Sequence, residues 1–252
     1  MKTKTKLLFA ALPILLSIAT AHAADRIVTM ETAPPLAKNA AAMPRIAAPA
    51  DDAETKINAA LRRLDANLGK AIAECAKAAK EAHTTPDWER TTEATMRGPG
   101  FVSFSIVDNS FCGGVHPNVS TMSIVYDLRT GTPVDWTKLL PASLTGKVAL
   151  QEGADGTKMV TLSSKRLTEL YLAGYQHPEP ECRQAMKDAA AENPPAMMVW
   201  LDAKAGGLAV QFDVAHVLQA CADPVTIPSS TLRELGASAR LLDAIAAARG
   251  AR

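Results

Sequence analysis

Four cysteines behind an export signal constrain the fold of this 252-residue chain more than any other feature of the sequence. The chain starts with three lysines in its first six residues, continues with the apolar run 7–18 and reaches a small-x-small triplet at 21–23. These three parts are typical of a secretory signal peptide, and the apolar run is shorter than the roughly 20 residues of a membrane-spanning helix. We therefore predict cleavage after Ala23 and a periplasmic or secreted mature chain.

The cysteines lie at Cys75, Cys112, Cys182 and Cys221. In an exported protein an even number of cysteines indicates disulfides, and four cysteines allow three connectivities. Pairing nearest neighbours in each half of the chain favours Cys75–Cys112 and Cys182–Cys221. Each bridge would then contribute about 3–4 kcal/mol in the chain-entropy model. None of the cysteines belongs to a CxxC pair, so we predict no metal site and no cofactor.

Charge and composition exclude several classes of protein. The chain has 27 Lys+Arg and 26 Asp+Glu, and removal of residues 1–23 leaves 24 basic residues against 26 acidic ones, a net charge of −2. A nucleic-acid binder needs a basic stripe that displaces counterions, so we predict no nucleic-acid partner. Hydrophobic residues make up 48% of the chain, which is too many for a disordered protein. We also predict no transmembrane segment after signal cleavage.

The clearest predicted element is a helix over residues 51–82. Its apolar residues recur at spacings of three and four, which places on one helical face Ile57, Leu61, Leu64, Leu68, Ile72 and Cys75. Asp51 and Glu54 have the spacing of a capping box at the helix start. Because Cys75 lies on the apolar face, we expect it to point inward and to bridge to a packed strand.

Residues 88–134 have the alternating pattern of an antiparallel meander. The predicted elements are strands at 89–96, 101–107 and 120–128, with turns at 97–100 and 129–132. Asp135 is placed to cap the short helical segment that follows.

The remainder of the chain alternates predicted helices with short strands. Helices are predicted over 163–173, 182–190, 214–220 and 239–248, and strands over 197–201, 208–212 and 225–227. Ser229 is predicted to cap a turn at 232–235. Since strands come in runs with helices between the runs, the fold class is α+β. We expect an antiparallel sheet packed against a long N-terminal helix and shorter C-terminal helices, in a single domain with disulfides.

The predicted organisation has four parts. They are the signal peptide at 1–23, an extended Ala/Pro-rich leader at 24–42, the α+β domain at 43–236 and a helical tail at 237–252. Four prolines between residues 34 and 49 disfavour both a helix and a central strand, which is why the leader is predicted to be extended.

The most unusual local run is Gly113-Gly114-Val115-His116-Pro117-Asn118. Two glycines allow positive φ angles and the proline stiffens the exit, so the loop presents His116 between them. One interpretation is a binding loop that offers His116 and Asn118 to a ligand, and we take Gly113, Gly114, His116, Pro117 and Asn118 as candidate binding residues. The alternative is a tight connection whose polar side chains bond its own backbone.

No sequence pattern of a known catalytic site occurs in the chain. His216 follows Asp213 by three residues, and such a pair could orient an imidazole for general-base catalysis. No nucleophile accompanies the pair, because Cys221 is predicted to be oxidised. We therefore predict no catalytic residue, and keep as an alternative an envelope hydrolase that uses His116 or the pair Asp213/His216.

Three segments resemble one known family. The segment 43–61 carries Pro44, Ile46, Ile57-Asn58 and Leu61, the segment 113–131 carries the Gly-Gly-x-His-Pro-Asn run, and the segment 206–232 ends on Ile227-Pro228 and Leu232. In this order they are similar to the extracytoplasmic domain of the lysozyme-sensing anti-sigma factor V, a module of unassigned function that also precedes some peptidoglycan deacetylases. Val115 stands where the family has alanine, and Ala215 and Ala220 replace its aromatic residues.

This resemblance implies a secreted α+β module that binds a component of the cell envelope without catalysis of its own. The partners it implies are lysozyme, another envelope protein or peptidoglycan fragments. The segments of a sigma-factor regulator and of a deacetylase are missing from the sequence, so we expect neither activity. A third hypothesis is a structural protein that docks to a partner through its N-terminal leader.

Overall fold

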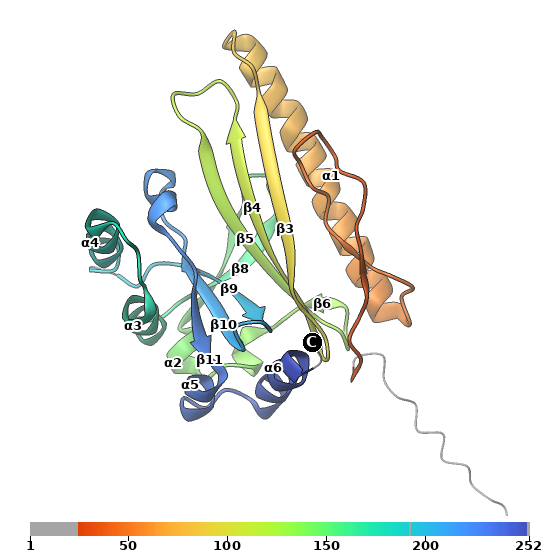
Figure 1. Cartoon of the computed structure of the whole chain (residues 1–252), viewed down its shortest axis with the longest axis vertical. Helices are drawn as coiled ribbons and strands as arrows, with labels where there is room; N and C mark the ends of the chain where they lie inside the picture. Colours follow the sequence, from red (N-terminus) through yellow and green to blue (C-terminus); the bar gives the residue numbers. More distant parts are fainter. Residues whose placement is uncertain (1–24, 192, 251–252) are drawn as a thin grey trace, which may run out of the picture.

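The computed structural model describes residues 25–191 and 193–250, so the predicted signal peptide and its cleavage site lie outside the described residues. Strands form a two-stranded, a four-stranded and a five-stranded antiparallel sheet (Figure 1). The strands are β1 (Met30–Glu31), β2 (Arg45–Ile46), β3 (Asp87–Arg97), β4 (Phe101–Phe111), β5 (Asn118–Asp127), β6 (Thr132–Pro133), β7 (Lys147–Glu152), β8 (Lys158–Ser163), β9 (Met197–Asp202), β10 (Gly207–Phe212) and β11 (Val225–Pro228). The helices are α1 (Asp52–Glu81), η2 (Trp136–Lys138), α2 (Ala142–Thr145), α3 (Lys165–Gly174), α4 (Pro180–Ala189), η3 (His216–Cys221), α5 (Ser229–Glu234) and α6 (Ala239–Gly250).

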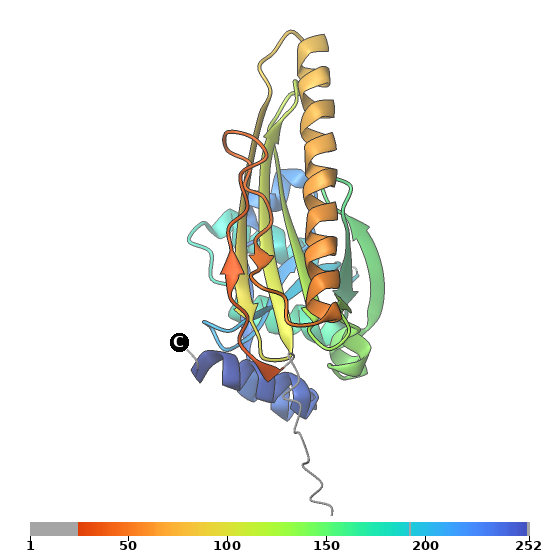
Figure 2. The same cartoon turned by 90° about the vertical axis from the view of Figure 1, so that its right-hand side faces the viewer.

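Helix α1 confirms the helix predicted from the apolar spacing. Asp51 caps it by accepting the backbone N–H of Glu54 at 2.9 Å. The predicted capping box is only half formed, because the Glu54 carboxylate accepts from Ala50 N–H and from Arg26 instead. The apolar face is buried, and α1 runs alongside the long strands β3, β4 and β5 in both views (Figures 1 and 2).

The four-stranded sheet has the order β3-β4-β5-β6 and is the predicted antiparallel meander. Strand β4 is longer than the predicted strand and is buried on both faces at its start, where Phe101, Val102 and Phe104 are inaccessible. A strand buried on both faces needs a partner layer on each side. The five-stranded sheet is one of these layers. It is joined to the four-stranded sheet by hydrogen bonds, because the Ser103 hydroxyl accepts from Leu201 N–H in β9 and the Ser123 hydroxyl of β5 donates to Val199 O.

The five-stranded sheet has the order β11-β10-β9-β8-β7. The predicted strands near 197–201, 208–212 and 225–227 are confirmed as β9, β10 and β11. The hairpin β7–β8 was not predicted, since β7 is an exposed edge strand whose apolar residues Val148 and Leu150 face solvent. The α+β fold class with a long N-terminal helix is therefore confirmed, with two main sheets in place of one.

The predicted leader lies against the domain. Within the leader, Val28 is 1% exposed and Ala40 is inaccessible. Val28 belongs to the main core and Ala40 to a second, smaller cluster, so the leader packs on the domain. Just after the leader, Ile46 is fixed to α1, because the Asn58 side chain bonds both its N–H and its C=O.

One buried ion cluster joins the four-stranded sheet to the turn of the β7–β8 hairpin, which belongs to the five-stranded sheet. Arg90 is 1% exposed and donates to Asp108 at 2.7 and 2.5 Å and to Asp155 at 2.8 Å. Trp88 Nε1 donates to the same Asp108 at 2.9 Å. Burial alone would lower the pKa of Arg90, but its bonds and charge interactions with the two carboxylates raise the pKa above its usual value. The guanidinium therefore stays charged and satisfies both buried carboxylates.

Both predicted disulfides are present, Cys75–Cys112 and Cys182–Cys221. Cys75 joins the inward face of α1 to the end of strand β4, as expected from its position on the apolar face. Cys182 in α4 is joined to Cys221 at the end of η3. Each bridge thus fixes a helical segment to its neighbour.

One local prediction near the C-terminus was wrong. Ser229 makes no capping bond; Pro228 occupies the cap position of α5, and Ser229 is the first helical residue. The helix predicted over 214–220 is confirmed as the 3₁₀-helix η3, which is shifted by one to two residues. Helix α6 confirms the predicted terminal helix and buries Leu241, Leu242 and Ile245. Among the described helices, none is long and apolar enough to cross a membrane.

Candidate functional site

The predicted binding loop is the tip of the long β4–β5 hairpin (Figure 1). His116 and Pro117 are exposed, and Val115 is 88% exposed. The tip rests on the end of α1, because Gly113 has φ +92° and a Cβ there would lie 2.7 Å from Ala82 Cβ. With the Cys75–Cys112 bridge beside it, the hairpin presents its exposed residues from a fixed base.

The structure brings the predicted loop residues together but gives them no catalytic partner. Among the described residues, neither His116 nor the Asn118 side chain forms a hydrogen bond or ion pair. Asn118 begins strand β5, so it is less exposed than the residues before it. The alternative interpretation requires hydrogen bonds from these side chains to the loop's own backbone, and the described residues contain none.

The pair Asp213/His216 is not assembled as a catalytic unit within the described residues. His216 is exposed at the start of η3, and no contact joins it to Asp213. Burial raises the pKa of Asp213, without a charged neighbour as a further cause. The histidine that does meet a carboxylate is His177, whose Nε2 lies 3.8 Å from Asp223 Oδ2.

A groove of about 650 Å³ runs along α1. One wall is the helix, and the other wall is the turn between β5 and β6 together with the start of β8. The lining residues are Lys56, Ala59, Ala60, Arg63, Leu64, Ala66, Asn67, Lys70, Tyr126, Gly131, Thr132, Pro133, Thr157 and Lys158. We call this the α1 groove.

All four charged residues of the α1 groove are basic: Lys56, Arg63, Lys70 and Lys158. Each is exposed, and none forms an ion pair with a described carboxylate. The first three are seven residues apart on α1, so they follow one face at intervals of about 10 Å. The groove is therefore a linear basic track on a chain whose charges nearly balance, with 27 Lys+Arg and 26 Asp+Glu.

The floor of the α1 groove is apolar and includes Tyr126, which is 3% exposed. Burial raises the pKa of the Tyr126 hydroxyl to about 12, although the charge of Arg63 acts to lower it. The phenol is thus neutral at ordinary pH, and it contributes no negative charge to the groove.

One end of the α1 groove depends on a glycine. Gly131 has φ +71°, and a Cβ there would lie 2.4 Å from the carbonyl oxygen of Ala53 in α1. Only glycine lets the β5–β6 turn approach the helix this closely. Leu64 and Pro133 line the space beside this contact.

Sequence reasoning missed the α1 groove. The heptad spacing of the three α1 cations is visible in the sequence, but it is also typical of the solvated face of a helix. The opposite wall comes from the β5–β6 turn and from β8, more than 55 residues away along the chain. Only the packing of the unpredicted hairpin β7–β8 brings Lys158 to the same groove.

The described residues form an α+β domain with a basic groove along α1 and an exposed tip on the β4–β5 hairpin. The structure is similar to a crystal structure of a member of the duf3298 family from Bacteroides fragilis, with a TM-score of 0.51 and 14% identity over 88% of this chain and 96% of that chain. A DUF3298 family protein from Pseudomonas aeruginosa PAO1 gives a TM-score of 0.37 and 14% identity over 61% of this chain and 63% of that chain. No family model and no curated protein matches the sequence.

The likeness to the Bacteroides protein establishes a shared fold. It confirms the predicted resemblance to a module of unassigned function at that level. The links to an anti-sigma factor, to peptidoglycan deacetylases and to lysozyme stay predictions.

Proposed function

We propose that the protein is an exported, non-catalytic binding module of the cell envelope, and that the α1 groove takes an anionic fragment of peptidoglycan. The observation that carries this proposal is the set of four exposed cations that line one groove without a carboxylate partner. Stem peptides of peptidoglycan carry several carboxylates on an extended chain, which is the chemistry that such a track would recognise.

The groove has the shape that a flexible oligomer requires. Its volume of about 650 Å³ lies within the range of ligand sites, roughly 300–1,000 Å³. The alanines at 59, 60 and 66 keep the helix wall low, and Thr132 and Asn67 add polar groups beside the cations. An apolar floor with polar groups at its rim is the usual composition of a ligand site.

Calorimetric titration of residues 24–252 with soluble peptidoglycan fragments tests this proposal. The variant Arg63→Glu/Lys70→Glu should weaken binding by at least about tenfold, because each exposed pair contributes up to about 1 kcal/mol and reversal adds repulsion. Raising the salt concentration should weaken wild-type binding as well.

The matched control is Arg62→Glu on the same helix. Arg62 is exposed but does not line the groove, so its reversal changes the net charge without changing the track. Equal losses in the two variants would refute a defined site and leave only a general effect of charge. Absence of heat with a folded wild-type chain would refute the ligand.

A second candidate function is recognition of a protein, such as lysozyme, through the β4–β5 hairpin tip. It is supported by the exposed apolar Val115 at a tip that the Cys75–Cys112 bridge and Gly113 fix to α1. Preorganised loops lose little entropy on binding, which favours affinity.

Titration with a c-type lysozyme tests this second function. His116→Ala and Asn118→Ala should weaken the complex if the tip is the contact surface, and the groove variant Arg63→Glu/Lys70→Glu should leave it unchanged. The opposite pattern would place the contact in the groove, and no binding by any form would exclude lysozyme as the partner.

The export that both functions require is a proposal from the signal peptide. Mass spectrometry of the protein recovered from its cell of origin should find a mature N-terminus at residue 24. A chain that retains residues 1–23 inside the cell would contradict it.

A further inference from the structure

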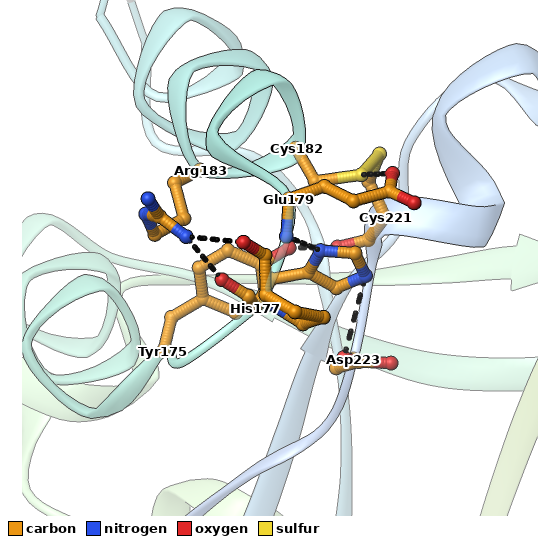
Figure 3. The surroundings of a disulfide bond; sticks show 8 residues. Tyr175, His177, Glu179, Cys182, Arg183, Cys221 and Asp223 are labelled. Carbon is orange, nitrogen blue, oxygen red and sulfur yellow. Dashed lines mark hydrogen bonds and ion pairs between the residues drawn. A yellow bond between two sulfur atoms is a disulfide. The ribbon is translucent and has the colours of Figure 1, made fainter.

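The Cys182–Cys221 disulfide lies in a corner rich in metal-binding side chains (Figure 3). His177, Glu179 and Cys182 each offer one ligand atom, and these atoms lie within 4.8 Å of one another. Cys221 adds a fourth group, because its sulfur is bonded to that of Cys182. The corner is built where the segment before α4 meets the end of η3.

The potential ligand groups of this corner lie close together. Glu179 Oε2 lies 3.7 Å from Cys182 Sγ, and His177 Nε2 lies 3.8 Å from Asp223 Oδ2. The His177 ring is held in place, with 12% of its side chain exposed and its plane stacked on Tyr175 at a centroid distance of 6.1 Å. The acids are accessible to solvent, so an ion could enter.

A disulfide cannot act as a pair of metal ligands, because the ligand is the thiolate. Reduction removes this block. A dithiol reductant supplies two electrons and two protons. The Cys182–Cys221 bond breaks to give two thiols, and the reductant is oxidised to its own disulfide. A divalent ion then displaces the two thiol protons to solvent, and two thiolates hold it.

We propose that this corner is a redox-gated zinc site, closed by the disulfide and opened by its reduction. The ligands are Cys182, Cys221, His177 and Glu179, and Asp223 lies behind the imidazole. Two sulfurs with one nitrogen and one oxygen match the ligand preference of Zn²⁺. Tetrahedral ligands at 2.0–2.3 Å from zinc are about 3.3–3.8 Å apart, so the 4.8 Å cluster needs only small side-chain movements.

Metal binding gives up one existing contact. The Nδ1 atom of His177 accepts the backbone N–H of Glu179 at 3.2 Å, and it can no longer do so once either ring nitrogen binds the ion. The loss is small, because that N–H lies at an exposed helix start where water can replace the acceptor. With Nδ1 on the ion, Nε2–H faces Asp223 and can donate to it, a contact that orients histidine ligands at many zinc sites.

The other disulfide of the same chain provides an internal comparison. Cys75 and Cys112 are surrounded by Ala40, Leu68 and Trp88, and no described histidine or carboxylate joins them in a cluster of ligands. Reduction of that pair would therefore yield two thiols without the further ligands of a zinc site.

The test measures metal binding to residues 24–252 in the oxidised form and after reduction with a dithiol that is then removed under nitrogen. Zn²⁺ affinity is measured by competition with a chromophoric chelator, and Co²⁺ is used to detect thiolate coordination by its charge-transfer absorption. One ion per reduced chain and none per oxidised chain is the expected result.

Variants separate this site from other thiols. Cys75→Ser/Cys112→Ser should keep the reduced-state site, and Cys182→Ser/Cys221→Ser should lose it. His177→Ala should weaken zinc binding by at least about tenfold, since even outer-shell partners contribute that much. Glu181→Gln is the matched control, because this neighbouring acid of α4 is not part of the cluster.

Alkylation gives a readout that does not depend on the overall fold. In the reduced chain, adding Zn²⁺ should slow the alkylation of Cys182 and Cys221 by iodoacetamide and leave the rates at Cys75 and Cys112 unchanged. An equal effect of zinc on all four cysteines, or no effect on any, would overturn the proposal. Metal binding that persists in Cys182→Ser/Cys221→Ser would overturn it as well.

Discussion

The two disulfides close loops of nearly equal length and yet lie in opposite surroundings. Their sequence separations are 37 and 39 residues, so the chain-entropy model assigns them the same stabilisation, about 4 kcal/mol each. Cys75–Cys112 lies in a small apolar cluster with Leu68 and Trp88, away from the main core. Cys182–Cys221 lies among His177, Glu179 and Asp223.

The two bridges therefore support different proposals. The first bridge fixes the far end of α1 and the β4–β5 hairpin tip, where four buried residues form a separate small cluster. The second bridge joins two short helical segments, with Cys221 packed against the main core and with polar, partly exposed side chains beside the sulfurs. Removal of the first bridge should therefore loosen the hairpin tip. Reduction of the second bridge should free two thiols as ligands for the proposed zinc site.

The largest expected effect is a loss of stability in the apolar surroundings of Cys75–Cys112. Arg90→Ala leaves Asp108 and Asp155 buried without their cation, which should lower the free energy of unfolding by about 3–5 kcal/mol. Trp88 bonds the same Asp108, so the cluster around Cys75 should loosen too. Urea denaturation measures the loss. The exposed Arg183→Ala is the control, and a loss below about 1 kcal/mol for Arg90→Ala would contradict the role of the ion cluster.

The next effect compares the bridges directly. Each of Cys75→Ser/Cys112→Ser and Cys182→Ser/Cys221→Ser should lower the free energy of unfolding by about 3–4 kcal/mol. Only the first variant should also weaken any partner that binds the hairpin tip, because only that bridge lies beside it. Denaturation and titration together measure the two outcomes, and an equal effect of both variants on tip binding would contradict the distinction.

A smaller effect sharpens the account of the tip. Gly113→Ala should lower the free energy of unfolding by about 1–3 kcal/mol, because φ is +92° and the new Cβ meets Ala82. Gly114→Ala is the matched control, since its Cβ would lie no closer than 4.0 Å to His116 O. Thermal denaturation of the two variants measures the difference. Equal stabilities would show that the tip does not rest on α1.

The smallest expected effect is a pH dependence of stability near the Cys182–Cys221 bridge. Burial raises the pKa of Tyr175 above its usual value of 10.0, with Asp223 adding to the shift. A raised folded-state pKa means that the stabilisation is complete below pH 10 and is lost as the pH rises through the folded value. We expect alkaline loosening to begin in this region, since the apolar cluster contains no tyrosine. Tyrosinate absorbance and near-UV circular dichroism detect it, and an unchanged alkaline transition in Tyr175→Phe would contradict it.

Local patterns predicted most of the secondary structure. The apolar spacing of α1, the alternation in β3–β5 and the nearest-neighbour cysteine pairs all depend on residues close together in the chain. The hairpin β7–β8 escaped prediction because its first strand lies at an edge and lacks a buried face. The structure has two main sheets where one was predicted, because strand partners and the bonds between the sheets, such as that from Leu201 N–H to Ser103, join residues up to about 100 positions apart.

The candidate sites were harder to predict than the fold. The loop at 113–118 stands out in sequence because its glycines and proline are local signals. The α1 groove and the Cys182 corner combine residues from separate elements, and each component has an ordinary explanation when taken alone. His177 lies only five residues before Cys182, but its meeting with Asp223 depends on how η3 leads into β11.

The pairing of the N-terminal segment has a consequence for the order in which the chain can assemble. Ala41 donates its N–H to Arg90 O, and Arg90 donates its own to Asn39 O, so residues near 40 have no place to dock until β3 exists. A chain made from its N-terminus therefore produces this segment early and positions it late. During that interval its apolar side chains stay uncovered, and a pause in synthesis before residue 90 prolongs their exposure.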